Sequence, residues 1–213
     1  MKKPIIVINL KTYKQGQEAI KLAKIIEKVD KNIIVGVQAS DIKEIVDKTR
    51  LKVYCQHIDY MKPGRETGFI IPEAVKANGA IGSFLNHSEH RLSFDIIKQT
   101  VSRCKKLKLK TMVFARDLKE AKKIEKLKPD YIIYEPPELV AGKVSVSKAK
   151  PNIISEIVKK IKIPILVGAG IKTKEDVKKS LELGAKGVAL SSAITTAKNP
   201  EKRLRELLKP KGL

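Results

Sequence analysis

Eight short apolar runs, rich in β-branched residues, recur along the whole chain and are separated by amphipathic segments. Most runs are continuously apolar rather than alternating, which is typical of strands buried on both faces. Because helical segments separate them, the runs indicate a parallel sheet built of strand–helix units. The predicted strands span residues 4–10, 33–38, 53–57, 81–86, 110–115, 131–135, 163–170 and 187–192.

The segments between these runs place apolar residues three or four positions apart, as one face of a helix requires. Eight strand–helix units favour closure into a (β/α)8 barrel over an open sheet. The 213 residues are fewer than the roughly 250 of a usual barrel, so some helices must be short. We expect the segment at 41–49 to be among the shortest. The sequence shows no linker, so residues 1–213 are predicted to form a single domain.

The composition is that of a folded, strongly basic protein. Hydrophobic residues make up 42% of the chain, too many for a disordered polycation. No apolar run approaches the roughly 18 residues of a membrane span, and the first residues lack a signal-peptide cleavage site. Cys55 and Cys104 are expected to be reduced core residues, and no Cys/His spacing suggests a metal site. We therefore predict a cytoplasmic globular protein without membrane association.

The formal net charge of +22 leaves two interpretations open. Lysines are distributed through every predicted helix, which favours solvated helix faces. A charge of this size can also attract an anionic substrate or a nucleic acid. Aromatic residues are only 4% of the chain, so a surface for base stacking is poorly supplied. Nucleic-acid binding is not expected as the main role, although basic residues gathered on one surface would favour it.

Polar and ionisable residues gather at the carboxyl ends of the predicted strands. In a (β/α)8 barrel these ends meet on one face, which is where the chemistry of such barrels takes place. The fold prediction therefore indicates a candidate site before any motif is considered. In chain order its members are Asn9, Lys11, Gln38, Gln56, His57, Asn86, His87, Glu135, Gly168 to Gly170, Ser191 and Ser192.

Four of these strand ends carry short motifs, and their order is informative. Each motif alone is weakly specific. Together, in register on an eight-unit pattern, they resemble the triosephosphate isomerase family in its short archaeal form, from about residue 4 to about residue 208. The motifs are Asn9-Leu10-Lys11, Asn86-His87-Ser88-Glu89, Tyr134-Glu135-Pro136-Pro137-Glu138-Leu139 and Val167-Gly168-Ala169-Gly170-Ile171.

The resemblance implies a TIM-type (β/α)8 barrel with shortened helices. It also implies the interconversion of dihydroxyacetone phosphate and glyceraldehyde 3-phosphate through an enediolate, without a cofactor, in glycolysis and gluconeogenesis. Glu135 matches the family's base, His87 its electrophile and Lys11 its electrostatic stabiliser. Asn9 and Leu10, beside Lys11, match substrate-binding positions.

The chemistry gives these roles a physical reason. A carboxylate with a pKa near 4.3 is normally a weak base, and burial would raise the basicity of Glu135. We predict that Ser88 and Glu89 begin a helix, whose N-terminus would keep His87 neutral. Ser88 and Glu89 are expected to support the site, with Glu89 either a partner of Lys11 or a first-turn helix residue.

The phosphate site is expected to rely on backbone N–H groups after the seventh and eighth strands. Gly170, Ser191 and Ser192 lie there, and their small side chains would let the backbone approach a dianion. The resemblance adds Val140, which matches a residue whose backbone meets the phosphate in archaeal relatives.

The loop after Glu135 departs from the archaeal pattern. That pattern resembles PPELIGTG, then an apolar residue and PVSKA, whereas this chain has Ala141-Gly142-Lys143 in place of Gly-Thr-Gly. The loop is the family's lid, and Ala and Lys adopt glycine backbone angles poorly. We expect slower turnover, which restoring Gly-Thr-Gly at 141–143 would raise. Phe114, where the family often has Cys, is a second departure and is expected to affect packing or stability.

Two further features concern surfaces. His57 and His90 lack a catalytic context and are expected to be structural or surface residues. The long loop from His57 to Gly68 matches one that reaches into a neighbouring subunit in the family, so self-association is expected, with a homotetramer favoured over a homodimer.

Three other interpretations fit parts of the sequence. Another phosphate-handling barrel, such as a ribulose-phosphate epimerase or an indole-glycerol-phosphate synthase, would suit the glycines at 168–170 but not the other motifs. A nucleic-acid-binding protein would bind with a steep dependence on salt. A non-catalytic barrel relative is disfavoured because Lys11, His87 and Glu135 are all present.

Overall fold

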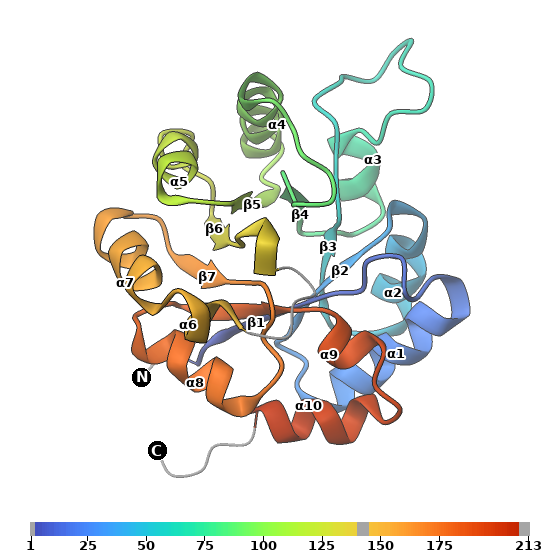
Figure 1. Ribbon diagram of the computed structural model, residues 1–213. Coiled ribbons are helices and arrows are strands. Elements are labelled where there is room, and N and C mark those ends of the chain that lie inside the picture. Colours follow the sequence, from blue (N-terminus) through green and yellow to red (C-terminus); the bar gives the residue numbers. More distant parts are fainter. Residues whose placement is uncertain (1–2, 140–144, 209–213) are drawn as a thin grey trace.

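The computed structural model describes residues 3–139 and 145–208, and its eight parallel strands form a closed barrel (Figure 1). Every strand pairs with its sequence neighbours, and β8 closes on β1 with Ile5 opposite Gly187 and Ile8 opposite Leu190. The strands are β1 (Ile5–Asn9), β2 (Ile34–Val37), β3 (Lys52–Cys55), β4 (Gly82–Leu85), β5 (Lys110–Ala115), β6 (Tyr131–Tyr134), β7 (Ile165–Val167) and β8 (Gly187–Leu190).

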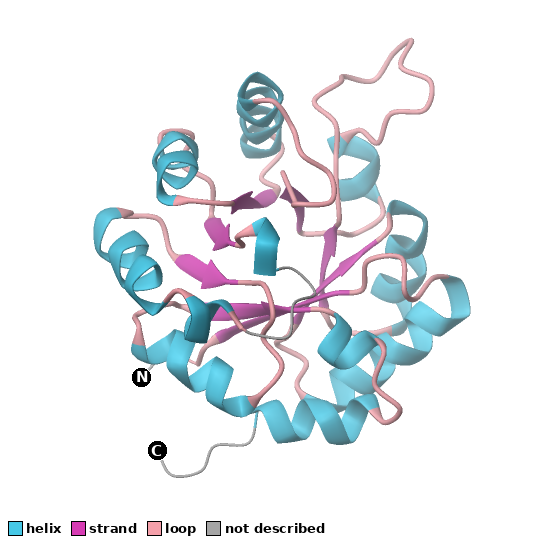
Figure 2. Ribbon diagram, in the orientation of Figure 1, coloured by secondary structure: helices cyan, strands magenta, loops and turns pink. Residues whose placement is uncertain are grey.

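Helices surround the barrel on its outer face (Figure 2). The longer ones in the described residues are α1 (Gly16–Val29), α4 (Phe94–Lys106), α5 (Leu118–Glu125), α7 (Pro151–Lys160), α8 (Lys174–Glu182) and α10 (Pro200–Leu208). The shorter ones are α2 (Ile42–Lys48), α3 (Pro72–Ala77), α6 (Val146–Ala149) and α9 (Ser192–Thr195), with single turns η1 (Ala39–Asp41) and η2 (Pro137–Leu139). None of the described helices is both long and apolar enough to cross a membrane.

Two apolar clusters hold the barrel together. The larger cluster fills the space between strands and helices, and it includes Cys55 and Cys104, which are buried and free as predicted. The smaller cluster fills the barrel interior with side chains from alternating strand positions. Gly36 makes room there, because a Cβ at that position would lie 2.0 Å from the Phe84 ring. The interior residues are Val7, Ile34, Tyr54, Phe84, Met112, Phe114, Ile133 and Leu166.

The prediction of eight strands is confirmed, although most of the strand boundaries differ from the predicted ones by one to three residues. The helix at 41–49 is short, as expected, but α3, α6 and α9 are shorter still. The strand predicted at 163–170 ends at Val167, because Ala169 and Gly170 adopt left-handed φ angles of 69° and 67°. The helix predicted to begin at Ser88 begins instead at Phe94, where the Ser93 side chain caps it.

Candidate active site

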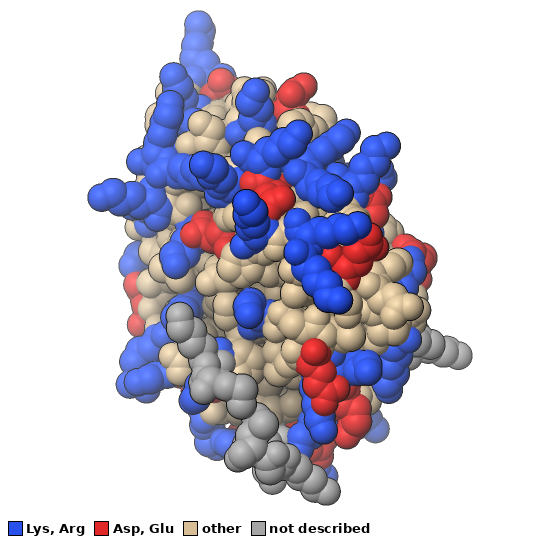
Figure 3. Space-filling model, turned by 90° about the vertical axis from the view of Figure 1, so that its left-hand side faces the viewer, with Lys and Arg blue, Asp and Glu red and all other residues tan. Residues whose placement is uncertain are grey.

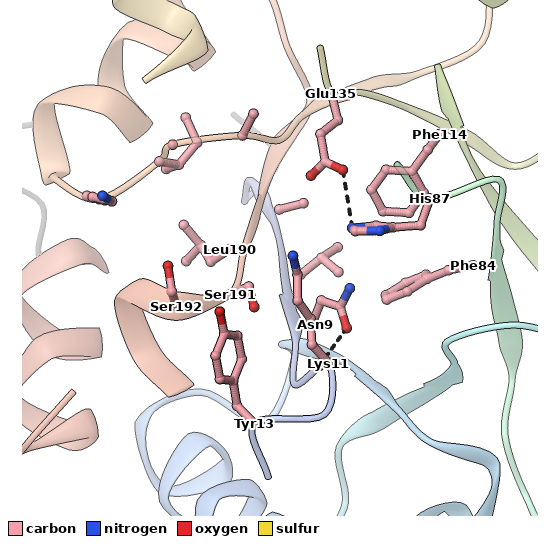
Figure 4. A pocket seen from close by; sticks show the side chains of 16 residues that line it. Asn9, Lys11, Tyr13, Phe84, His87, Phe114, Glu135, Leu190, Ser191 and Ser192 are labelled. Carbon is pink, nitrogen blue, oxygen red and sulfur yellow. Dashed lines mark hydrogen bonds and ion pairs between the residues drawn. The ribbon is translucent and has the colours of Figure 1, made fainter. Parts of the chain in front are cut away.

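A cavity opens at the carboxyl ends of the strands, on the face that the sequence indicates. In Figure 4, Glu135 and His87 approach it from one side, and Ser191, Ser192 and Tyr13 lie on the other. Residues at the ends of six strands, β1, β4, β5, β6, β7 and β8, or in the loops after them, line the cavity, so the site is assembled by barrel closure. The lining residues are Val7, Asn9, Lys11, Tyr13, Phe84, His87, Phe114, Glu135, Ala169, Gly170, Ile171, Lys172, Ala189, Leu190, Ser191 and Ser192.

Lys11 is held in the cavity by an unusual backbone conformation directly after β1. Its φ of 48° lies in the left-handed region, which costs a non-glycine residue roughly 1–2 kcal/mol. Asn9 Oδ1 accepts the Lys11 N–H at 2.9 Å, and Gln56 Nε2 donates to the Lys11 carbonyl at 2.9 Å. The Lys11 ammonium contacts Glu89 Oε1 at 2.5 Å. The neighbours therefore fix both the strained backbone and the position of the charge.

Glu135 is the buried carboxylate of the site. Burial raises its pKa to about 7, against the opposing effects of the Lys11 charge and the hydrogen bond from Ser88. Ser88 Oγ donates to Glu135 Oε2 at 3.1 Å. Gly168 leaves the space that the carboxylate occupies, because a Cβ there would lie 2.9 Å from Glu135 Oε1. A carboxylate so placed is a stronger base than one in water.

His87 faces Glu135 with its Nε2 atom, which lies 3.2 Å from Glu135 Oε2. Its Nδ1 accepts the backbone N–H of Glu89 at 3.1 Å, so in the neutral ring the proton is on Nε2. Burial, followed by the Lys11 charge, lowers the pKa of His87 to about 4. The ring packs edge-on against Phe114 at a centroid distance of 4.7 Å. Phe114, which stands where the family often has Cys, therefore contacts a residue of the site.

The predicted reason for a neutral His87 was wrong in one respect. Residues 88–90 form a turn, in which the His90 N–H donates to the His87 carbonyl, and not the first turn of a helix. No helix dipole therefore acts on the ring at this position. Burial and the nearby ammonium keep it neutral instead.

The opposite end of the cavity offers backbone N–H groups and small residues. Ala169 and Gly170 both have left-handed φ angles, which turn the chain after β7 toward the cavity. Ser191 Oγ is buried without a hydrogen-bond partner in the described residues, and α9 begins directly after it, at Ser192. An unpaired buried hydroxyl is costly and needs an explanation, and an anionic ligand would supply its partner.

Asp176, on α8, joins the loop after β7 to the segment that follows residue 144. Its carboxylate accepts hydrogen bonds from Ser145 Oγ at 2.7 Å, from Lys172 N at 3.1 Å and from Thr173 N at 2.8 Å. Burial alone would raise the pKa of Asp176, but these hydrogen bonds lower it to about 2. Ser145 stands where the archaeal pattern has proline, so its hydroxyl adds a contact that proline would lack.

Most predicted site residues lie together. Gln38 does not line the cavity and directly precedes η1. Leu10 is fully buried, and its N–H donates to the Gly36 carbonyl, so it does not line the cavity. Val140 and Ala141-Gly142-Lys143 lie outside the described residues. His57 and His90 stack on each other with centroids 4.2 Å apart, and neither lines the cavity.

Sequence reasoning missed two contributors, Tyr13 and Asp176. It placed Gln56 at the candidate site but gave no sign of its hydrogen bond to the Lys11 carbonyl. Tyr13 could have been found by its place two residues after Lys11, but the contacts of Gln56 and Asp176 depend on tertiary packing. In the described part of the chain, no three His, Cys, Asp or Glu residues are placed to hold a metal ion.

Comparison with known proteins places this geometry in context. The family model described as triosephosphate isomerase matches residues 4–209. A triosephosphate isomerase of Methanocaldococcus jannaschii is 43% identical over 96% of this chain and 99% of its own length. One from Saccharolobus solfataricus is also 43% identical, over 98% of this chain and 96% of its own. The crystal structure of the Bartonella henselae triosephosphate isomerase has the same fold, with a TM-score of 0.75 at 20% identity over 97% of this chain and 99% of that one.

Proposed function

Because the chain belongs to the triosephosphate isomerase family, we propose that Lys11, His87 and Glu135 are the residues that carry out its reaction. The protein is an isomerase that interconverts dihydroxyacetone phosphate and glyceraldehyde 3-phosphate. Only protons change place between these two sugars, so the chemistry requires a base, an acid and charge stabilisation.

Glu135 is the proposed base. Its carboxylate takes a proton from the carbon next to the carbonyl of dihydroxyacetone phosphate, and the C–H electrons form the double bond of an enediolate. The same carboxyl group then returns the proton to the neighbouring carbon, while the hydroxyl proton of the first carbon passes to the oxygen of the second, which produces the aldehyde and the new hydroxyl. A pKa of about 7 suits both halves of this cycle, because the group gives up and takes up a proton with similar ease near neutral pH.

His87 is the proposed electrophile. The Nε2–H of a neutral ring would donate to the substrate oxygen on which negative charge develops. A carboxylate base paired with a neutral imidazole is a known feature of triosephosphate isomerase catalysis. The Glu89 N–H at Nδ1 supports this assignment, because it fixes the tautomer that presents a proton to the cavity.

Lys11 is the proposed electrostatic stabiliser. Its side chain is only 15% exposed, and so its charge acts on the enediolate with little screening by solvent. Asn9 positions Lys11, while Gly170, Ser191 and Ser192 are proposed to bind the phosphate. The unpaired Ser191 hydroxyl supports this last assignment.

The proposal depends most on one observation, the contact of 3.2 Å between His87 Nε2 and Glu135 Oε2 inside a buried cavity. Glu135→Gln keeps the size of the side chain and removes its basicity. We expect kcat to fall by at least about 10³-fold. Glu182→Gln, an exposed change on α8, is the matched control and should retain full turnover. Equal activity in the two variants, purified from a host lacking its own isomerase, would exclude Glu135 as the base.

We also propose that residues 1–213 act as one catalytic domain, in the cytoplasm, and assemble into a homotetramer. Two separate surfaces support two kinds of contact between copies. The loop between β3 and α3 projects from the barrel (Figure 1), and it carries Phe69 with 45% of its area exposed. A groove between α4 and α5 is lined by Leu92, Phe94, Ile97 and Ile124 together with five charged residues, and Phe94 is 39% exposed.

Light scattering after size-exclusion chromatography tests the assembly. The expected mass is four times the 23.7 kDa of one chain. Phe94→Glu should halve this mass, because a charge would be buried in one of the two contacts. A tetramer that is unaffected by Phe94→Glu would show that the α4–α5 groove is not an interface, and a dimeric wild type would exclude the tetramer.

A further inference from the structure

The positive charge of the protein is distributed unevenly over its surface. Around α1, α2 and α10, carboxylates form ion pairs with many of the basic side chains. Around α4, α5 and α7 fewer basic side chains are paired, as in Arg103–Glu73 and Lys160–Glu156, and Figure 3 shows Lys and Arg gathered over the part of the surface that these three helices form. The matched pairs on the first side include Lys28–Glu201, Lys43–Asp47, Lys48–Glu44, Arg50–Glu27 and Arg205–Glu201.

We define the basic face as a set of exposed lysines at the carboxyl ends of α4, α5 and α7 and in the turns that follow. Among the residues that the structure describes, ion pairs engage only one of them, Lys160, through Glu156. The nearby carboxylates of Glu125 and Asp130 accept backbone N–H groups instead. The members are Lys106, Lys108, Lys110, Lys122, Lys126, Lys128, Lys159, Lys160 and Lys162.

The basic face is continuous, because hydrogen bonds connect its turns. Lys105 Nζ donates to the Leu127 carbonyl at 2.6 Å, which joins the end of α4 to the turn after α5. The Lys162 N–H donates to Glu125 Oε1 at 2.5 Å, which joins the turn after α7 to α5. These turns lead into β5, β6 and β7, which are neighbours in the barrel. The basic face therefore lies at the amino ends of these strands, opposite the active-site cavity.

Two of these lysines occupy positions where glycine would be the more stable residue. Lys108 and Lys128 have left-handed φ angles of 58° and 51° at the ends of α4 and α5. At the ends of α3 and α8 the left-handed residues in the position of Lys108 are Gly79 and Gly184, with φ angles of 91° and 95°. Glycine is the usual residue at this position because it has no Cβ.

The hydrogen bonds show that the turn at Lys108 is equivalent to the turn at Gly184. The N–H of Lys108 donates to the Lys105 carbonyl, as the N–H of Gly184 does to Leu181. The next residue donates five positions back in both turns, Leu109 to Cys104 and Ala185 to Ser180. The chain therefore places lysine in a turn that elsewhere takes glycine, and the charge accumulates despite a conformational cost. The helix dipole favours cations here but does not require them in the left-handed position.

We propose that the basic face binds the phosphate backbone of a nucleic-acid duplex, independently of base sequence. Unpaired ammonium groups on flexible stems suit phosphates, and they carry no means of distinguishing bases. The face offers no exposed aromatic platform, since Tyr131 nearby is half-buried, so a stacked duplex fits better than a single strand. Leu109 and Ile161 are buried, so the face also lacks the apolar residues that would enter a membrane.

Fluorescence anisotropy with a labelled DNA duplex of about 25 base pairs, between roughly 50 and 200 mM salt, tests the proposal. The test variant is K108G/K126Q/K128G/K162Q, and the matched control is K21Q/K24Q/K31Q/K202Q, which removes the same charge from α1, the turn after it and α10. Glycine adopts the left-handed angles of positions 108 and 128 without a Cβ penalty, so the two glycine changes should leave the fold intact and a loss of binding would not reflect a loss of folding.

The test variant should bind the duplex at least about tenfold more weakly at low salt, whereas the control should change by less than about threefold. The salt slope should fall by about 0.9 for each lost phosphate contact, and isomerase turnover should be unchanged in both variants. Equal losses of duplex affinity in the test and control variants would overturn the proposal, because binding would then depend on net charge and not on the basic face. Absence of duplex binding at low salt would overturn the proposal. So would tighter binding to phosphatidylserine vesicles than to the duplex.

Discussion

At the scale of single residues, burial prepares Glu135 and His87 for opposite tasks. Both side chains are almost inaccessible to solvent, and burial disfavours the charged form of each. The pKa of Glu135 therefore rises to about 7 while that of His87 falls to about 4. Above neutral pH the carboxylate is charged and the ring is neutral, which is the combination that proton abstraction and oxyanion stabilisation require.

The raised pKa of Glu135 predicts that the residue destabilises the fold at alkaline pH. The unfolded carboxyl ionises near 4.5, whereas the folded one holds its proton up to about 7. Between these values the unfolded state loses its proton first, so stability falls as pH rises and stays low above 7. Glu135→Gln should therefore raise the free energy of unfolding by up to about 3 kcal/mol at pH 8.

Urea denaturation at pH 8 and at pH 4 would measure this effect. At pH 4 both states are protonated, and the gain should largely disappear. Glu182→Gln, which is exposed, should show little change at either pH. A Glu135→Gln variant that is less stable than the wild type at pH 8 would contradict the role assigned to burial.

At the scale of elements, the site depends on how each strand ends. Lys11, Asn86 and Ala169 follow or end strands in left-handed conformations, with φ angles of 48°, 63° and 69°. Such strain is concentrated at functional sites and persists only where neighbours fix it. Asn86 illustrates this, because its Nδ2 donates to the Phe114 carbonyl at 2.9 Å and its Oδ1 accepts from Leu92 N at 3.0 Å.

Asp176 is expected to hold the loop after β7 in place. Asp176→Asn removes the negative charge and replaces one carboxylate oxygen with an NH2 group. This NH2 group would face the Lys172 N–H or the Ser145 hydroxyl in place of an acceptor. We expect a loss of about 2–3 kcal/mol in the free energy of unfolding at pH 7. KM should also rise more than kcat falls, because the loop carries Gly170 of the phosphate site. Asp95→Asn, an exposed change in the first turn of α4, should leave both quantities unchanged.

The sequence predicted the elements well and their ends less well. Continuous apolar runs identify strands buried on both faces, and all eight were found. The ends depend on backbone angles that composition does not reveal. The alanine at position 169 gives no sign in the sequence of its left-handed φ angle. The residue that caps α4 is Ser93 and not Ser88. The helix expected at Ser88 fails because the backbone there turns back to place the Glu89 N–H on His87.

At the scale of the whole molecule, the barrel separates two surfaces of different chemistry. The carboxyl ends of the strands form the cavity, and the amino ends of β5, β6 and β7 carry the basic face. The motifs predicted the cavity, because barrel closure brings strand ends together whatever the helices do. The basic face could not be predicted, because lysines occur in every helix and only the ion pairs of the folded chain show which of them lack a partner.

The central claim is that burial makes Glu135 a base with a pKa near neutrality. Carbon-13 NMR of protein labelled at the glutamate side-chain carboxyl measures this directly, with Glu135→Gln identifying the resonance by its loss. The resonance of Glu135 should titrate with a midpoint of about 7. A midpoint near 4.5 for Glu135 would contradict the claim, because the carboxylate would then be no stronger a base than one in water.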